Sequence, residues 1–544
     1  MSSEPTHMTY GVKGVNFYAE YDQRVQHVPL HADYAHLRPP LPRLTDERDI
    51  FIGVASYRDG VKCGFTLWSA FARATYPEKV FFGIVDQTFE GDPICIEEYC
   101  KLAKQSWPEE ECKYKNQVRI DARSAKTSKG PTLSRSQQYP LLEEEEFCMM
   151  IDSHSQFIYK WDELVIEEWR RTENEMAVLS NYPMGFNGMG ENFTINSNFA
   201  PHICNYMSRY SNDEIARYSG LAFAYNFDKP LLSVSWAGGF SFGKCHSWKR
   251  APIDPYMNWV FWGEEFLHAY QLWTRGYDLY SPSRHGAVVF HNWTNDAKPK
   301  PRFWDNVTVV TTQEQHDREE AMSYNRLKLM FRLPFNGEVD SREIDKYGGG
   351  KVRSLEQFLT FVNISNTDYN KDFAACNQVH FVPYQDSTEL EELLPGWQFL
   401  DSHLQSKNGA VMNETQLQNL EKKLNHVQND NTNLLSALRD VKIEQNQMIK
   451  LMNEAKEEMR VKEDAMIAEV QNVLNIAIVQ NSRAMKSINA RMRQMQDHST
   501  FNEYFQLVPI LILIIGTAIA TYFGRRCRSN ESIPERTSTK IETI

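Results

Sequence analysis

The run Ile151-Asp152-Ser153-His154 is the sharpest candidate for chemistry in the chain, and it directly follows the apolar residues 147–150. On an extended chain Asp152 and His154 point to the same face, because side chains alternate with a period of two. A carboxylate and an imidazole on one face suit Mn²⁺ or a related ion better than Ca²⁺. We therefore predict a divalent-cation site here, although an isolated Asp-x-His occurs by chance about once in a chain of this length and then has a structural role.

Further polar side chains follow other apolar or aromatic runs. A second expected strand, 287–290, ends in His291, which we predict as the third metal ligand. Glu264 and Glu265 follow an aromatic run and are candidates for catalysis. The remaining candidates for binding a ligand are Ser56, Arg58, Asp59, Asp86, Lys129, Arg135, Gly238 and Gly239. Taken one at a time, each of these residues also fits a solvated loop or surface position.

The elements that must position these residues alternate along the chain. Short β-rich runs are separated by longer amphipathic stretches from about residue 48 to about residue 345, which indicates an α/β domain with a largely parallel sheet. In such folds ligands bind beyond the carboxyl ends of the strands. The candidate residues follow strands, so we expect them to meet at that edge.

Taken in order, these residues resemble one family, the GT-A-type N-acetylglucosaminyltransferases that include a cytosolic hydroxyproline-modifying enzyme acting on a ubiquitin-ligase adaptor, and parasite mucin-type homologues. The resemblance covers roughly residues 48–363. It rests on the ordered set IFIGVASYRD (50–59), KGPTLSR (129–135), IDSHSQF (151–157), WAGGFSFG (236–243), FWGEE (261–265), RGYDLYSP (275–282) and RSLEQF (353–358). It implies a GT-A-like (Rossmann-like) nucleotide-sugar-binding domain.

The resemblance also implies a reaction. A sugar, with N-acetylglucosamine favoured, would move from a uridine diphosphate (UDP) donor to a hydroxyl acceptor on a protein or glycan, with retention at the sugar carbon. A cation, Mn²⁺ or alternatively Mg²⁺, would neutralise charge on the departing diphosphate. Asp152, His154 and His291 would be its ligands.

The other candidate residues receive roles in the same reaction. Charged donors bind phosphate oxygens strongly, so Arg58, Lys129 and Arg135 are expected on the diphosphate or nucleotide. Asp59 and Asp86 are expected on the ribose or uracil, and Ser56 is a further candidate for binding the donor. Gly238 and Gly239 would give close backbone approach to the sugar. Glu264 and Glu265 would face the sugar and the incoming hydroxyl, one of them orienting the acceptor or assisting its deprotonation.

Two other classes of protein fit the same residues. A metal-dependent nucleotide-sugar hydrolase would use the same Asp and His ligands. A membrane-tethered coiled-coil structural protein would carry a non-catalytic glycosyltransferase-like domain. Nucleic-acid binding is disfavoured by the net charge of −12, because a phosphate-binding surface needs clustered Lys and Arg.

The 544 residues divide into several zones. We expect an extended N-terminal arm (1–45), the glycosyltransferase domain (46–365), a linker (366–412), a coiled coil (413–497), a transmembrane helix (505–524) and a basic polar tail (525–544). Heptad spacing of apolar residues from Leu417 to Ile476, with Asn431 in the seam, predicts a parallel homodimer.

Signals for cellular location disagree. The uncharged run 507–523 precedes Arg525, Arg526 and Arg528, which favours a cytoplasmic tail and a lumenal domain, where sequons at Asn192, Asn292, Asn306, Asn363 and Asn413 would accept glycans. The N-terminus has no signal peptide. The nine cysteines are scattered without a zinc-site spacing, which favours reduced buried thiols. We therefore expect a single-pass C-terminal anchor with a cytosolic catalytic domain, and a lumenal domain (endoplasmic reticulum or Golgi) as the alternative.

Overall fold

The computed structural model describes residues 6–12, 15–207, 209, 215–220, 222–293 and 301–400, with isolated positions between 469 and 490. The chain divides into two compact units, Met1–Ala410 and Val411–Ile544. The predicted coiled coil, membrane helix and tail lie outside the described residues apart from those isolated positions, so they stay predictions. Within the part that is described, no helix is long and apolar enough to cross a membrane.

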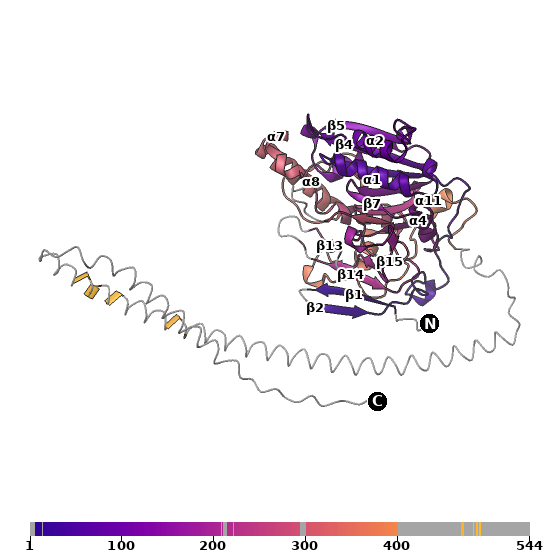
Figure 1. The fold of residues 1–544 in the computed structure, drawn as a ribbon. Helices are drawn as coiled ribbons and strands as arrows, with labels where there is room; N and C mark the ends of the chain where they lie inside the picture. Colours follow the sequence, from indigo (N-terminus) through magenta and orange to yellow (C-terminus); the bar gives the residue numbers. More distant parts are fainter. Residues whose placement is uncertain are drawn as a thin grey trace, which may run out of the picture. The chain divides into compact units, whose positions relative to one another are not determined.

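The first unit is built on an eight-stranded sheet (Figure 1). Its strands lie in the order β15 (Leu231–Ser233), β17 (Asp278–Ser281), β8 (Ala177–Ser180), β16 (Phe240–Lys244), β6 (Phe147–Asp152), β3 (Ile50–Tyr57), β4 (Val80–Thr88) and β5 (Val118–Ser124). The pairs β3–β4, β3–β6, β4–β5 and β17–β8 are parallel, and the other three pairs are antiparallel. The predicted α/β class is confirmed, and the sheet is mixed.

Both faces of this sheet are buried, which is why its central strands are apolar throughout. In β3, Ile50, Ile52 and Val54 enter one core and Phe51 enters the other. Helices α1, α2 and α4 cover the first face, and α5, α6, α8 and α10 cover the second. The helices are α1 (Gly60–Arg73), α2 (Cys95–Ser106), α3 (Pro131–Ser136), α4 (Trp161–Arg170), α5 (His246–Arg250), α6 (Glu264–Thr274), α7 (Val307–Val310), α8 (Gln313–Met330), α9 (Ile344–Tyr347), α10 (Leu355–Phe361) and α11 (Thr388–Leu393).

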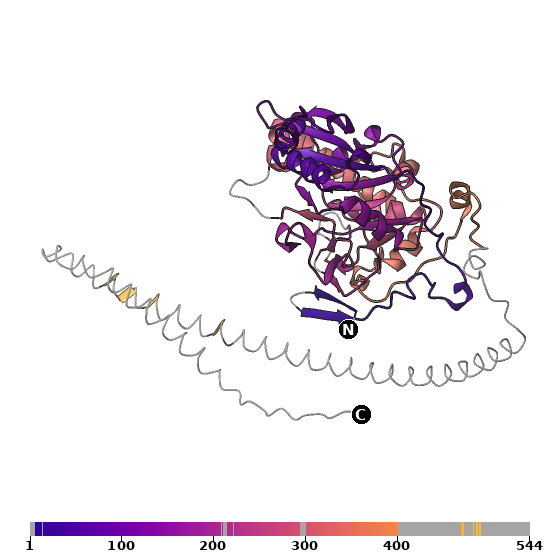
Figure 2. The same cartoon turned by 45° about the vertical axis from the view of Figure 1, so that its right-hand side comes forward.

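The N-terminal residues form a hairpin where an extended arm was expected. Strands β1 (His7–Val12) and β2 (Val15–Ala19) pair with each other, and β1 pairs with β14 (Ala222–Tyr225) in a four-stranded antiparallel sheet completed by β11 (Phe199–His202). In both views the hairpin lies at the opposite end of this unit from α1 and α2 (Figure 1, Figure 2). Its partner strand lies about two hundred residues away in sequence, so no local pattern marks the pairing.

Short two-stranded ladders complete the fold. Their strands are β9 (Met189–Gly190) with β10 (Thr194–Ile195), β12 (Asn205–Tyr206) with β13 (Tyr218–Ser219), and β7 (Ser155–Phe157) with β18 (Val289–His291). The last ladder matters most for the site, because it holds residues 155 and 291 opposite each other.

Residues 366–400, expected to be part of a linker, pack into the first unit. Phe381, Trp397 and Phe399 are at most 4% exposed and belong to the core beneath the second face of the sheet. Cys376 is bonded to Cys204. The domain therefore extends past the predicted boundary at 365.

The cysteine expectation is overturned by the structure. All eight cysteines of the described part are paired, as Cys63–Cys95, Cys100–Cys112, Cys148–Cys245 and Cys204–Cys376, with Cα–Cα distances from 4.8 to 5.2 Å. These distances are ordinary for disulfides. Sequence spacing did not reveal the pairs, because the most distant partners are 172 residues apart. Only Cys527 of the nine lies outside the described residues.

Two phenylalanines of segment 366–400 give a matched test of its packing. Phe399 is 4% exposed and Phe373 is 54% exposed. We expect Phe399→Ala to lower the free energy of unfolding by about 3–5 kcal/mol, because it leaves a cavity in the core. Phe373→Ala should change it by less than about 0.5 kcal/mol. Urea denaturation measures both, and equal small effects would mean that the segment is a linker after all.

Candidate active site

The carboxyl ends of three parallel strands meet at one edge of the large sheet. The register places Ala55 of β3 beside Asp152 of β6, and Ser56 of β3 beside Asp86 of β4. A cavity of about 1130 Å³ opens at this edge, and Asp152, with Glu264 and Glu265 of α6, lies in its wall. The predicted meeting of strand-end residues is therefore present in the fold.

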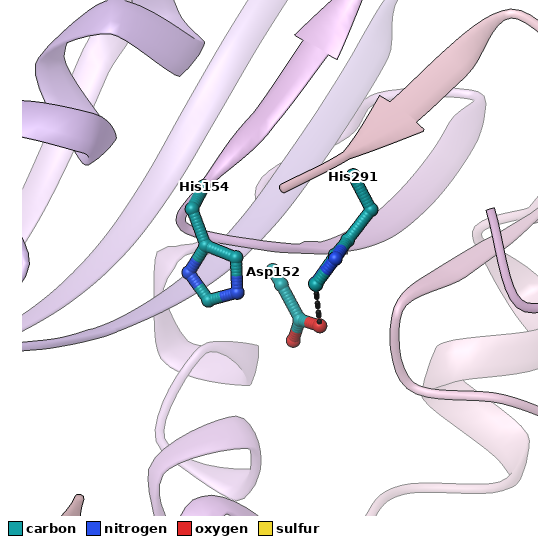
Figure 3. A group of neighbouring side chains, drawn as sticks. All are labelled: Asp152, His154 and His291. Carbon is teal, nitrogen blue, oxygen red and sulfur yellow. Dashed lines mark hydrogen bonds and ion pairs between the residues drawn. The ribbon is translucent and has the colours of Figure 1, made fainter. Parts of the chain in front are cut away.

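The three predicted metal ligands come together in this cavity (Figure 3). Asp152 ends β6, His154 lies in the turn that follows, and His291 ends β18, which pairs with β7 directly after that turn. Their ligand atoms all lie within 4.8 Å of one another. Asp152 Oδ2 is 3.0 Å from His291 Nε2, and the two imidazole rings are 4.5 Å apart between centroids. One carboxylate and two imidazoles form a donor set that suits a divalent transition-metal ion.

Asp59 lies directly behind this group. Its Oδ2 is 2.9 Å from His154 Nδ1 and accepts a hydrogen bond of 3.0 Å from the Ser153 hydroxyl. A carboxylate on one imidazole nitrogen fixes the ring and leaves the other nitrogen to bind a metal. Asp59, predicted as a ribose or uracil contact, thus gives the triad the support that metal-binding histidines need. The residues present fit a divalent cation.

Arg135 lies between two of the predicted carboxylates. Its Nη2 donates to Asp152 Oδ1 at 3.1 Å and its Nη1 donates to Glu264 Oε2 at 2.7 Å. The guanidinium also lies against the backbone of Gly238, where a Cβ atom would come within 2.6 Å of Arg135 Cζ. Gly238, predicted to let a sugar approach, is thus needed first to let Arg135 approach.

The charge of Asp152 is held by its partners. Burial alone would raise the pKa of this carboxyl group, but the hydrogen bond and charge of His291 and the charge of Arg135 outweigh burial and hold the pKa well below its usual value. Asp152 is therefore an anion at neutral pH, the form that binds a cation.

Glu264 and Glu265 are neighbours in sequence with different surroundings. Glu264 is 3% exposed and pairs with Arg135 through Oε2, while its Oε1 has no hydrogen-bond partner among the described residues. Glu265 is half-buried in the cavity wall, and it accepts from the Tyr182 hydroxyl and, at 3.0 Å, from Gly238 N. Burial raises the pKa of Glu265 to about 7, although both hydrogen bonds oppose that rise. Glu265 is thus the carboxylate that changes protonation state near neutral pH.

Four other predicted residues are not among those that line the cavity. Arg58 forms an ion pair of 2.7 Å with Asp92, and Lys129 forms one of 2.8 Å with Glu319. Ser56 and Asp86 are at most 2% exposed, and Asp86 accepts from the Cys95 backbone N–H at the start of α2. Their predicted nucleotide contacts stay predictions. Gly239, in contrast, lies in the cavity wall beside Asp152.

The cavity also has residues that sequence reasoning did not single out. Tyr182 follows β8 and Gln87 lies near the end of β4, so both carry the strand-end signal that was used for Asp152. Phe261, Trp262 and Trp304, which line the cavity, are 40%, 49% and 41% exposed. We call these three residues the aromatic rim. Phe261 contacts Trp262 and Trp304 edge to face.

Comparison with known proteins gives a family match. The family model described as "Glycosyltransferase (GlcNAc)" matches residues 49–110 and 99–368, and no curated protein matches the chain. Among solved structures, GalNAc-T7 with UDP, GalNAc and Mn²⁺ aligns with a TM-score of 0.36 and 13% identity over 58% of this chain and 57% of that one. Staphylococcus aureus TarS 1–349 in complex with UDP-GlcNAc aligns with a TM-score of 0.27 and 14% identity over 52% of this chain and 73% of that one. Mannosyltransferase PcManGT from Pyrobaculum calidifontis in complex with GDP-Man and Mn²⁺ aligns with a TM-score of 0.31 and 11% identity. The alignment covers 60% of this chain and 73% of that one. The chain therefore spans little more than half the length of GalNAc-T7.

Adjacent glycines test the position of Arg135. Gly238→Ala should displace the guanidinium and break a hydrogen bond to a charged group, lowering the free energy of unfolding by about 1.5–3 kcal/mol. Gly239→Ala meets Pro183 Cδ at 3.3 Å and Asp152 Oδ2 at 3.5 Å, so it should cost less. Chemical denaturation of both variants compares them. Equal costs would mean that Arg135 is not held against Gly238.

Proposed function

Because the chain belongs to the glycosyltransferase (GlcNAc) family, we propose that this cavity transfers a sugar from a UDP donor to a hydroxyl group of an acceptor. The sugar favoured by family resemblance is N-acetylglucosamine, transferred with retention of configuration. The observation that carries the proposal is the meeting of Asp152, His154, His291 and Arg135 in one cavity at the carboxyl edge of the sheet. All four residues lie inside the range that the family model matches.

Asp152, His154 and His291 would hold a divalent cation, Mn²⁺ or alternatively Mg²⁺. When bound, the cation supplies positive charge that stabilises the diphosphate as it leaves the sugar. Asp59 keeps the His154 ring in place through Nδ1. The pairing of Asp152 with His291 and Arg135 keeps its carboxylate ionised before a donor arrives.

Arg135 and Glu264 form the donor side of the cavity in this proposal. Arg135 donates directly to the predicted ligand Asp152, and guanidinium groups bind phosphate oxygens strongly. Glu264 Oε1 is a buried acceptor without a hydrogen-bond partner in the described part of the chain, so it is available to accept from a sugar hydroxyl.

Glu265 and the aromatic rim form the acceptor side. Aromatic side chains offer an apolar surface on which a sugar ring or a peptide can lie, and Phe261, Trp262 and Trp304 expose theirs beside the cavity. Glu265 lies in the wall with a pKa raised by burial to about 7, which suits a group that takes a proton from an incoming hydroxyl. The acceptor would be a hydroxyl of a protein or a glycan.

Metal removal and donor choice test this function together. We expect the full chain to release UDP from UDP-N-acetylglucosamine in the presence of an acceptor extract, and to prefer it over other nucleotide sugars. EDTA should abolish release and Mn²⁺ should restore it. Asp152→Asn should be inactive, while Asp33→Asn, whose side chain is 82% exposed, should be normal.

The same assay separates the alternatives. Release that does not depend on any acceptor would identify a nucleotide-sugar hydrolase, and a chain that binds no UDP would have a structural role.

Asp59→Asn tests whether Asp59 supports His154 as a metal ligand. The substitution should weaken Mn²⁺ binding by about 10–100-fold, measured by electron paramagnetic resonance of the free ion. Unchanged affinity would remove Asp59 from the site.

The pH dependence of the rate tests Glu265. The proton acceptor must be ionised, so kcat/KM should rise about tenfold per pH unit below pH 7 and level off above it. Glu265→Gln should be slow and should lack this inflection. Glu173→Gln, at an exposed ion pair on the surface, should keep it. An inflection that persists in Glu265→Gln would assign the titration to another group.

A further inference from the structure

Three of the four disulfides in the described part of the first unit are buried. Cys63, Cys95, Cys148 and Cys204 are fully buried, and their partners Cys245 and Cys376 are at most 3% exposed. An oxidant outside the folded domain would not reach these thiols. Only Cys100–Cys112 is half-buried.

The bonds also join elements that pack against each other. Cys63–Cys95 connects α1 to the first residue of α2, and Cys148–Cys245 connects β6, the strand that ends in Asp152, to the N-cap of α5. Cys204–Cys376 ties residues 366–400 to the small sheets. Complete pairing of eight cysteines is typical of domains that fold in an oxidising compartment and is rare in the cytosol.

Two of the sequons lie on the surface of the same unit. Asn192 belongs to Asn-Phe-Thr, in the three-residue turn between β9 and β10, and is exposed. Asn363 belongs to Asn-Ile-Ser, two residues after the end of α10, and is exposed. In the described part of the chain neither carboxamide forms a hydrogen bond. A bulky polar modification at either side chain would extend into solvent without disturbing the core.

A third sequon, at Asn292, provides the contrast. Asn292 is half-buried, follows the predicted ligand His291, and its backbone N–H donates to His154 O at 3.1 Å. The next residue, Trp293, lines the cavity and donates from its indole nitrogen to Pro183 O at 2.8 Å. A glycan on Asn292 would therefore lie at the active cavity.

We propose that the domain of residues 6–400 folds in an oxidising, lumenal compartment and carries N-linked glycans on Asn192 and Asn363 but not on Asn292. The disulfides and the exposed sequons are independent observations, and disulfide formation and N-linked glycosylation would both take place in that compartment. This location is the reverse of the cytosolic one expected from the scattered cysteines. It agrees with the three arginines after residue 523, which favour a cytoplasmic tail.

The test uses the full chain isolated from the cells that produce it, lysed in N-ethylmaleimide to trap free thiols. Peptide mapping by mass spectrometry should find the eight paired cysteines unalkylated. Peptide N-glycosidase should release a glycan from the peptides that contain Asn192 and Asn363. It should release none from the peptide that contains Asn292. Alkylated cysteines, or unmodified Asn192 and Asn363, would overturn the proposal.

Variants locate the glycans in the same cells. Asn192→Gln and Asn363→Gln should each remove one glycan from the intact mass, and the pair of substitutions should remove both. Asn292→Gln should leave the mass of the glycans unchanged, and a loss there would contradict the assignment. None of these measurements depends on turnover of the sugar donor, so they test this proposal independently of the transferase function.

Discussion

The carboxylate of Asp152 is the interaction on which the rest of the site depends. One oxygen meets His291 at the end of β18, and the other meets Arg135 of α3. Arg135 continues the chain of charges to Glu264 at the start of α6. Burying a charge costs several kcal/mol unless it is paired, so each member is tolerated in the wall only because the next one is present. These contacts hold β6, the β7–β18 ladder, α3 and α6 in one geometry before any ligand binds.

The cavity that results has two chemically different sides. Near the sheet edge its wall carries Asp152, Arg135 and two histidines, which fits the charged donor proposed for this side of the cavity. At the rim it exposes aromatic rings, which suit an acceptor held by apolar contact. A transferase must keep the charged donor apart from the acceptor until the hydroxyl is in place. The distribution of residues between wall and rim corresponds to that requirement.

Local sequence pattern was enough to predict the class of the fold and to select three candidate metal ligands that the fold brings together. Asp152 ends β6, a parallel strand of the large sheet, and His291 ends β18, which pairs antiparallel with β7 directly after the turn that holds His154. Contacts between residues far apart in the sequence could not be predicted from local pattern. The match of Cys204 with Cys376, the pairing of β1 with β14, and the packing of Phe399 are contacts between distant segments that leave no mark in local periodicity. The contacts that Asp59 and Gly238 make with His154 and Arg135 were not predicted for the same reason, because these partners are remote in sequence.

Glu264 and Glu265 illustrate how neighbours acquire different chemistry. Both begin α6, where the positive end of the helix dipole favours a carboxylate. Glu264 has a guanidinium 2.7 Å away. Glu265 has only a phenol and a backbone N–H, and the negative charge of Glu264 beside it adds to the effect of burial. Pairs of titratable groups whose environments differ in this way divide the work of an active site. Glu264 holds Arg135 in place. Glu265, whose pKa burial raises to about 7, is the carboxyl group that the proposed reaction would use to take a proton from the acceptor.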